Sequence, residues 1–352
     1  MPRFSTLVRL LSASLFGRHD SVGKVPLPLS EEEWSALFDL SRREAVTALL
    51  YDAILLLPKE QRPPKSVLFH FLSMVQTIEE DNRVRESALT AFASLMKASL
   101  SLPTNVVKGT SLSRRFPKPE HRECGDNDLY TGADTETIAA YMESQGLYVE
   151  RKDPRHVSFS YKDVTFECHN YLLYHQDDPA WLFTEQSDGL CFLPSWQEAF
   201  FIAKHIEHHT VFFHNPVRLR DLVDWTVLLT SEDFDYAAFA DLKKGTDVDV
   251  FADMMSLYCE SLFGIELAGH ASRTLAKGLK AEDFEPIYMR CPERHRLAVV
   301  RVARRSGKYI RYWRQYKKIY GMSMFRRFYF SNLRVAIKQS GRKSPHNPSA
   351  GH

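Results

Sequence analysis

Asp126 and Asp128, two aspartates separated by one residue, are the side chains whose type and spacing point most directly to chemistry. Residues 124–130 have the pattern of a β-strand, along which side chains alternate, so both carboxylates leave the same face. Two negative charges that close repel each other unless a cation lies between them. The pair is therefore either a metal site or two solvated surface acids, and the second interpretation is the usual one for an isolated motif.

A glycine turn precedes this pair in the chain. Lys108 and Gly109 follow a short apolar run at residues 105–107 and lead into a helical pattern at residues 112–116. Because Gly109 has no Cβ, backbone N–H groups can approach a phosphate there, and the hydroxyls of Thr110 and Ser111 can donate further hydrogen bonds. The pattern predicts an anion-binding turn.

A third carboxylate comes from the segment 164–169. Its alternation places Glu167 and Thr165 on one face of a strand and Phe166 and Cys168 on the other. Glu167 is then able to join the aspartate pair, with His169 lining the pocket beside it. Neighbours on a strand point in opposite directions, so a catalytic pair of Cys168 with His169 is not expected.

These elements together resemble the nucleotidyltransferase superfamily of DNA polymerase β type. The shared order is Lys-Gly followed by hydroxyl residues, then Arg122 and Gly-Asp-x-Asp, then a strand ending in Glu-x-His. The chain looks closest to a bacterial branch of poorly characterised nucleotidyltransferases. The resemblance covers about residues 34–229 and includes an arginine-aspartate helix at residues 218–225.

The resemblance implies a metal-dependent nucleotidyltransferase, which moves a nucleoside monophosphate from a nucleoside triphosphate to an unknown acceptor and releases pyrophosphate. Asp126, Asp128 and Glu167 would bind Mg²⁺ or Mn²⁺ in a two-metal mechanism, with Glu167 also helping to deprotonate the acceptor. The residues expected at the nucleotide, with Lys108 and Arg122 neutralising its phosphates, are Lys108, Gly109, Thr110, Ser111, Arg122 and Arg220.

Two positions depart from the superfamily pattern. Thr110 stands where serine is usual, which is a mild change. Asn127 stands between the aspartates where an apolar residue usually faces the core, so its amide must find partners or lie near an edge.

The helix at residues 218–225 allows two interpretations. Asp221 can pair with Arg218, and Arg220 with Asp224, at the spacing of a helical turn, which describes a salt-bridged helix. Alternatively, Arg220 reaches the nucleotide phosphates.

The periodicities predict an α+β fold, with a small mixed β-sheet nucleotidyltransferase core flanked by N-terminal and C-terminal helical regions. Five strands are expected, at residues 105–107, 124–130, 147–150, 156–161 and 164–169. Four regions follow: residues 1–102 are helical, 103–195 form the core sheet, 196–288 are helices that wall the pocket, and 289–352 are a basic helical segment with a loose tail.

The charge of this last segment is strongly biased. From Arg290 onward there are twelve Arg, five Lys and one acid, a balance of +16 that leaves −14 on the rest of a chain whose net charge is +2. The basic stripe can dock on the acidic remainder of the chain, bind a nucleic acid or lie on an anionic surface. Tyr309, Trp313, Tyr316 and Tyr320 form an aromatic stripe that favours core packing.

Other patterns bound the function. His205 and His209 lie one helical turn apart but match no zinc motif, which favours a partly exposed histidine-rich helix surface. Five cysteines without CxxC spacing indicate neither disulfides nor zinc and fit a cytoplasmic protein. The N-terminus is typical of an amphipathic helix rather than a signal peptide, and no transmembrane segment is expected.

Two rivals to the enzyme remain open. One is a catalytically silent relative that senses nucleotide, which would bind nucleotide without releasing pyrophosphate. The other is a nucleic-acid-binding module centred on residues 290–343, whose binding would weaken steeply with salt.

Overall fold

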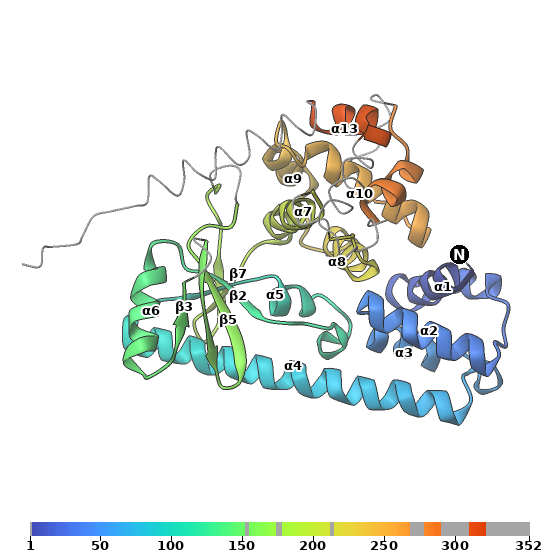
Figure 1. The fold of residues 1–352 in the computed structure, drawn as a ribbon, viewed down its shortest axis with the longest axis horizontal. Helices are drawn as coiled ribbons and strands as arrows, with labels where there is room; N and C mark the ends of the chain where they lie inside the picture. Colours follow the sequence, from blue (N-terminus) through green and yellow to red (C-terminus); the bar gives the residue numbers. More distant parts are fainter. Residues whose placement is uncertain are drawn as a thin grey trace, which may run out of the picture.

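The computed structural model describes residues 2–151, 155–173, 178–211, 215–267, 278–289 and 310–321. It confirms the predicted α+β class, because one mixed sheet is surrounded by many helices (Figure 1). The helices are α1 (Pro2–Phe16), α2 (Glu31–Glu44), α3 (Thr47–Leu56), α4 (Lys65–Leu100), α5 (Gly109–Ser113), α6 (Thr135–Ser144), α7 (Ser195–Val211), α8 (Leu219–Leu229), α9 (Tyr236–Lys243), α10 (Asp249–Phe263) and α13 (Trp313–Tyr320).

The sheet has seven strands in the order β3-β4-β5-β2-β1-β7-β6. They are β1 (Thr104–Val107), β2 (Asn127–Tyr130), β3 (Val149–Glu150), β4 (His156–Tyr161), β5 (Val164–His169), β6 (Thr184–Ser187) and β7 (Leu190–Phe192). β2 pairs antiparallel with β1 and parallel with β5, so it lies in the middle of the sheet. The strand that carries Asp128 is thus held from both sides.

The prediction of five strands is wrong in number. β6 and β7 form an additional hairpin, and β7 pairs parallel with β1. The four residues of β6 are polar and exposed, so its sequence lacks the alternation of apolar and polar residues that indicates a strand. The second strand is also shorter than predicted, because it begins at Asn127 and leaves Asp126 just ahead of it.

α4 is a 36-residue helix that runs beneath both halves of the molecule (Figure 1). Its first part packs Val67 and Phe71 into a hydrophobic core formed by the N-terminal helices and by α7, α8 and α10. Its last part packs against the sheet, where the Phe92 ring lies 4.8 Å from the Phe166 ring. This side of the sheet is mostly apolar, whereas Asp128 of β2, His156 of β4 and Glu167 of β5 face the other side.

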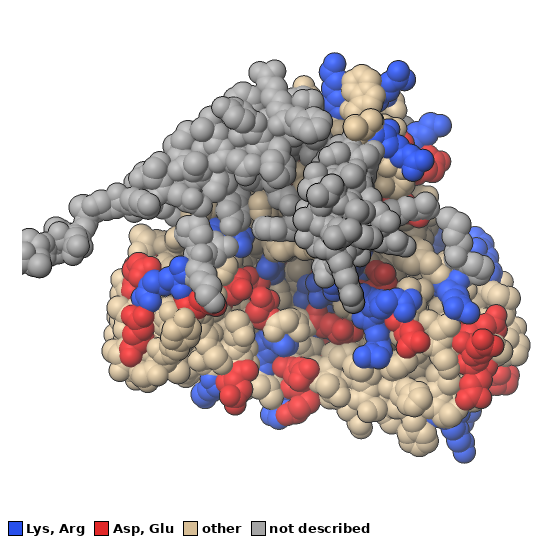
Figure 2. Space-filling view, viewed as in Figure 1, with Lys and Arg blue, Asp and Glu red and all other residues tan. Residues whose placement is uncertain are grey.

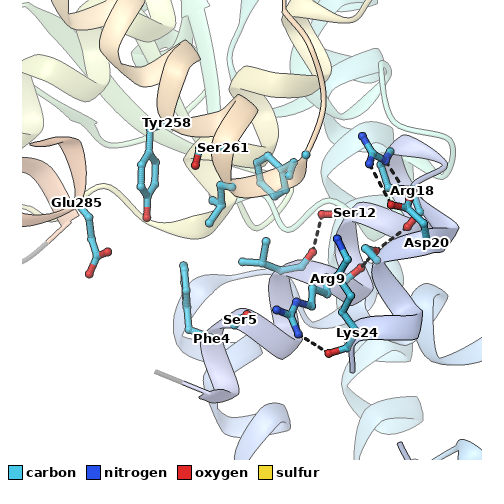
Figure 3. Close-up of a pocket in the computed structure, with 15 residues that line it drawn as sticks. Phe4, Ser5, Arg9, Ser12, Arg18, Asp20, Lys24, Tyr258, Ser261 and Glu285 are labelled. Atoms are coloured by element: carbon cyan, nitrogen blue, oxygen red, sulfur yellow. Dashed lines mark hydrogen bonds and ion pairs between the residues drawn. The ribbon is translucent and has the colours of Figure 1, made fainter. Parts of the chain in front are cut away.

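A cavity of about 620 Å³ lies between α1 and α10, away from the sheet (Figure 3). Its lining mixes apolar side chains such as Phe4 and Phe263 with the ion pair of Arg18 and Asp20, whose Nε and Oδ1 atoms lie 3.0 Å apart.

In the basic C-terminal segment, residues 310–321 are described, and the other residues from Arg290 onward lie outside the described residues. The predicted aromatic stripe packs in part: Tyr316 and Tyr320 are buried, and the Tyr320 hydroxyl lies 3.0 Å from that of Tyr288, whereas Trp313 is exposed. No described helix is both long and apolar enough to cross a bilayer.

Candidate active site

Three carboxylates meet on the polar side of the sheet. Asp128 of β2 is the direct register partner of Glu167 of β5, so both side chains leave the same face. Asp126 reaches the same place from the turn before β2. One oxygen from each of the three lies within 4.8 Å of the others, which is a spacing that a divalent cation can bridge.

Burial and mutual repulsion oppose full ionisation of these three carboxylates. Burial, together with the negative charges of Asp128 and Asp126, raises the pKa of Glu167 to about 7. Burial by itself would raise the pKa of Asp128 as well, but the ammonium of Lys108 and a hydrogen bond from His169 hold that pKa below its ordinary value. Added positive charge would therefore stabilise the fully ionised cluster, as metal binding requires.

Lys108 and Gly109 form the turn that faces these carboxylates. Lys108 has a φ of 54° and directs its Nζ to within 2.8 Å of Asp128 Oδ2. Gly109 has a φ of 34°, and a Cβ there would lie 3.1 Å from the backbone oxygen of Asp126. The turn thus packs closely on the loop that carries Asp126, as only glycine permits.

Arg122 joins the turn to α8. Its guanidinium is buried and binds both carboxylate oxygens of Asp224 at 2.7 Å, while Nη1 donates to the Gly109 carbonyl at 3.2 Å. Asp224 therefore pairs with Arg122 and not with Arg220, which corrects the expected pairing along α8. Asp221 accepts a hydrogen bond from the Arg218 backbone N–H, so it caps the helix.

The loop that leads into Asp126 is fastened to the middle of α4. Asn82 donates its amide hydrogens to the carbonyls of Glu120 and Arg122, at 2.8 and 2.9 Å. Arg85 donates to the carbonyl of Gly125 at 3.2 Å. Asn127, the unusual residue between the aspartates, is buried and donates to the Arg85 carbonyl at 3.4 Å. Its amide thus contributes to the attachment of the loop to α4.

A cavity of about 100 Å³ opens beside the carboxylates. Asp126, Asp128, Lys108 and Gly109 form one wall, and α7 and α8 form another. On the face seen in Figure 2, a hollow lies between the sheet and the N-terminal helices, and acidic and basic side chains gather around it. The cavity has room for a phosphate group with its cations rather than for a whole nucleotide, since ligand pockets usually measure about 300–1,000 Å³.

The other predicted site residues are placed as follows. Arg220 lines the cavity, and its Nη1 lies 3.4 Å from the Glu123 carbonyl oxygen. Arg122 lines it too, but with its guanidinium bound to Asp224. Ser111 is fully buried, and neither it nor Thr110 is among the described residues that line the cavity.

Histidines contribute more than the sequence indicated. His169 is buried, and its Nε2 lies 2.9 Å from Asp128 Oδ1. Burial lowers the pKa of His169 to about 4 despite the neighbouring aspartate, so the ring is neutral at pH 7 and Nε2 donates to the carboxylate. His205 of α7 lines the cavity and lies against His209, with ring centroids 4.1 Å apart. Within the described residues, this pair belongs to no group of three metal ligands.

Comparison with known proteins shows the family of the chain. A protein family described as uncharacterised nucleotidyltransferase matches residues 30–264, which is two thirds of the chain and includes the carboxylate cluster, the glycine turn and α8. No curated protein and no solved structure matches the chain. With this match over most of its length, the chain belongs to the family of uncharacterised nucleotidyltransferases.

Proposed function

We propose that the chain is a metal-dependent enzyme that transfers a nucleoside monophosphate from a nucleoside triphosphate to an acceptor hydroxyl or phosphate. The observation that carries this proposal is the meeting of Asp126, Asp128 and Glu167 beside the turn at Gly109, in a chain whose family transfers nucleotidyl groups. In the reaction, an acceptor oxygen bonds to the α-phosphorus, the bond from that phosphorus to the bridging oxygen breaks, and pyrophosphate leaves.

The residues present fit divalent cations such as Mg²⁺ or Mn²⁺. Oxygen donors from three carboxylates suit these hard ions, and the pKa of Glu167 is raised by burial and by the neighbouring negative charges, which a cation would offset. Asp126, Asp128 and Glu167 would hold them. When bound, such ions neutralise charge on the phosphates and make an acceptor oxygen more nucleophilic.

Other side chains then bind and orient the substrate. The Gly109 turn leaves space for the phosphates, and Lys108 and Arg220 supply positive charge at the cavity. Arg122 holds the turn in position through the Gly109 carbonyl. Glu167 is the carboxylate that we assign to the proton of the acceptor.

The test is release of pyrophosphate from each of the four nucleoside triphosphates, with Mg²⁺ or Mn²⁺ and with cell extract as the source of acceptor. Activity is expected for the wild type and a loss of at least about 100-fold for Asp126→Asn and Asp128→Asn. Glu136→Gln, which neutralises an exposed acid on α6, is the control and should keep full activity. Nucleotide binding without pyrophosphate release would instead indicate a silent nucleotide sensor.

A further inference from the structure

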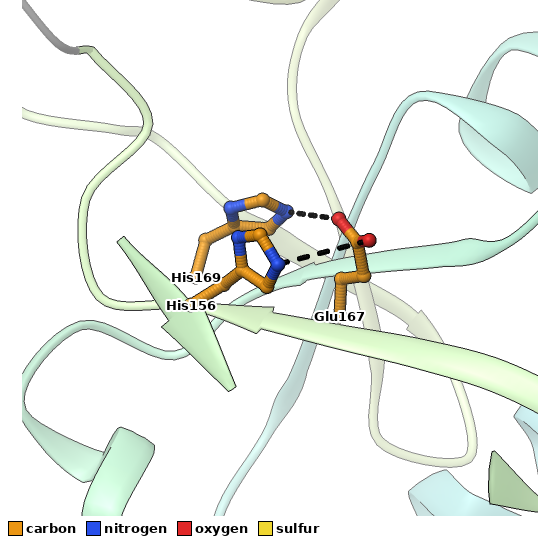
Figure 4. A group of neighbouring side chains, drawn as sticks. All are labelled: His156, Glu167 and His169. Carbon is orange, nitrogen blue, oxygen red and sulfur yellow. Dashed lines mark ion pairs between the residues drawn. The ribbon is translucent and has the colours of Figure 1, made fainter. Parts of the chain in front are cut away.

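Two histidines flank the carboxylate of Glu167 on the hairpin of β4 and β5. His156 and His169 are register partners across this hairpin, so their rings leave the sheet on the same face, with centroids 4.9 Å apart. Glu167 lies two residues before His169 on that face. In Figure 4 both rings point toward its carboxylate, one from the first residue of β4 and the other from the last residue of β5.

The atoms that face one another, imidazole nitrogens and carboxylate oxygens, are all of types that can bind a metal ion. His156 Nε2 lies 3.7 Å from Glu167 Oε1, and His169 Nε2 lies 3.6 Å from Glu167 Oε2. One donor atom from each residue lies within 4.8 Å of the others. Ligands at about 2.0–2.2 Å from one tetrahedral zinc ion lie about 3.3–3.6 Å apart, which is close to the distances from the two imidazole nitrogens to the Glu167 oxygens. Small side-chain rotations would therefore close the site.

We propose that His156, Glu167 and His169 bind one divalent transition-metal ion of the zinc type, at a position next to the Asp126, Asp128 and Glu167 cluster. Imidazole nitrogen favours zinc, nickel and copper, whereas Mg²⁺ prefers oxygen. Two imidazoles with one carboxylate are a known zinc ligand set that leaves a fourth position open.

The hairpin provides a rigid frame for these ligands. β4 and β5 pair along six residues each and are joined by a two-residue turn at Lys162 and Asp163. The side chains of His156, Glu167 and His169 are 12%, 26% and 5% exposed, so the ligand atoms are sheltered while an ion can still enter past Glu167.

Binding of such an ion would alter the neighbouring cluster. His169 Nε2 donates to Asp128 in the present structure, and a metal bond at that nitrogen requires its proton to move to Nδ1. Glu167 is also shared by the two ligand sets. Zinc at the histidines would therefore take Glu167 away from the Asp126, Asp128 and Glu167 cluster and break the hydrogen bond from His169 to Asp128. Zn²⁺ and Mg²⁺ would then compete for Glu167.

The experiment is a calorimetric titration of the untagged, metal-free chain with Zn²⁺ alone at pH 7.5, without nucleotide. One ion is expected per chain, and His156→Gln should weaken its binding at least tenfold. Co²⁺ bound to the wild type should show visible absorption bands that His156→Gln lacks. Because no nucleotide is present, the result does not depend on the proposed transferase activity.

Two controls separate this site from its neighbours. Asp126→Asn should keep zinc affinity and lose affinity for Mg²⁺, whereas Glu167→Gln should lose both. His209→Gln alters the other histidine pair and should bind zinc as the wild type does. Melting curves verify that each variant folds. If His156→Gln does not fold, the loss of zinc binding is measured on Glu167→Gln instead. Lack of stoichiometric zinc binding, or equal affinity in the wild type and His156→Gln, would overturn the proposal.

Discussion

The ion pair of Arg122 with Asp224 allows a direct measurement of how strongly the site is held together. Both side chains are about 95% buried, and Asp224 is bound through both oxygens at 2.7 Å. Asp224→Asn keeps the volume and one acceptor oxygen but removes the negative charge. The guanidinium is then left in the interior with no charge to balance it.

The expected loss of stability follows from this burial. Removing one partner of a buried ion pair costs about 3–5 kcal/mol, and the acceptor that Asn retains places this variant near the lower end. For a chain of this length, about 3 kcal/mol corresponds to a fall in melting temperature of about 4 °C. The affinity for Mg²⁺ should fall as well, because Arg122 also binds the Gly109 carbonyl beside Asp126.

Thermal and urea unfolding measure the first effect and calorimetry measures the second. The matched control is Asp233→Asn, which removes an aspartate from another arginine, with Arg115 Nη1 and Asp233 Oδ1 2.9 Å apart. The Asp233 side chain is 55% exposed, so its loss should cost at most about 1 kcal/mol. If Asp224→Asn were no less stable than Asp233→Asn, the view of Arg122 as a buried anchor would be refuted.

Three further predictions concern the cluster itself. The pKa of Glu167 rises from about 4.5 in the unfolded chain to about 7 in the folded one, so the metal-free protein should lose up to about 3 kcal/mol as pH rises through this window. Melting of Glu167→Gln should lack this loss, and equal pH dependence of both proteins would contradict it. Gly109→Ala should destabilise by about 1–2 kcal/mol in urea unfolding, because a Cβ at positive φ would press on the Asp126 backbone. Lys108→Met should raise the calorimetric affinity for Mg²⁺ alone about tenfold, because the ammonium beside Asp128 repels the ion, while nucleotide binding weakens.

Local patterns were enough to predict the fold class and the face that Asp128 and Glu167 share, but they placed Asp126 on the strand, which in the structure begins one residue later. Strand alternation placed Glu167 on the face of Asp128, and the structure pairs these two residues directly. The functional roles assigned to them stay predictions. His156 could have been found in the same way, because the two-residue turn at residues 162–163 sets the register that brings it beside His169.

The hairpin of β6 and β7 also has a turn signal in its sequence. Asp188 and Gly189 form its turn, with φ values of 45° and 84°, and Asp-Gly is a strong hairpin signal. The pairing of Arg122 with Asp224, in contrast, has no local sequence signal. Asp224 lies 102 residues away in sequence, and only the packing of α8 against the glycine turn brings the two together. Spacing within one helix favoured Arg220 as its partner, and no local pattern indicates the correct one.

The length of α4 has a consequence for how the chain tolerates change. Residues 79–87 of this helix contain no buried side chain, yet they separate the residues packed in the N-terminal core from those packed under the sheet. One inserted residue would rotate everything beyond it by about 100° and advance it by about 1.5 Å, turning Phe92 away from the sheet. Exposed positions in this stretch such as Glu86 should accept substitutions, unlike Asn82 and Arg85, which hold the loop before β2, but single insertions and deletions should not be tolerated. The helical periodicity of α4 thus fixes the orientation of the sheet relative to the N-terminal helices.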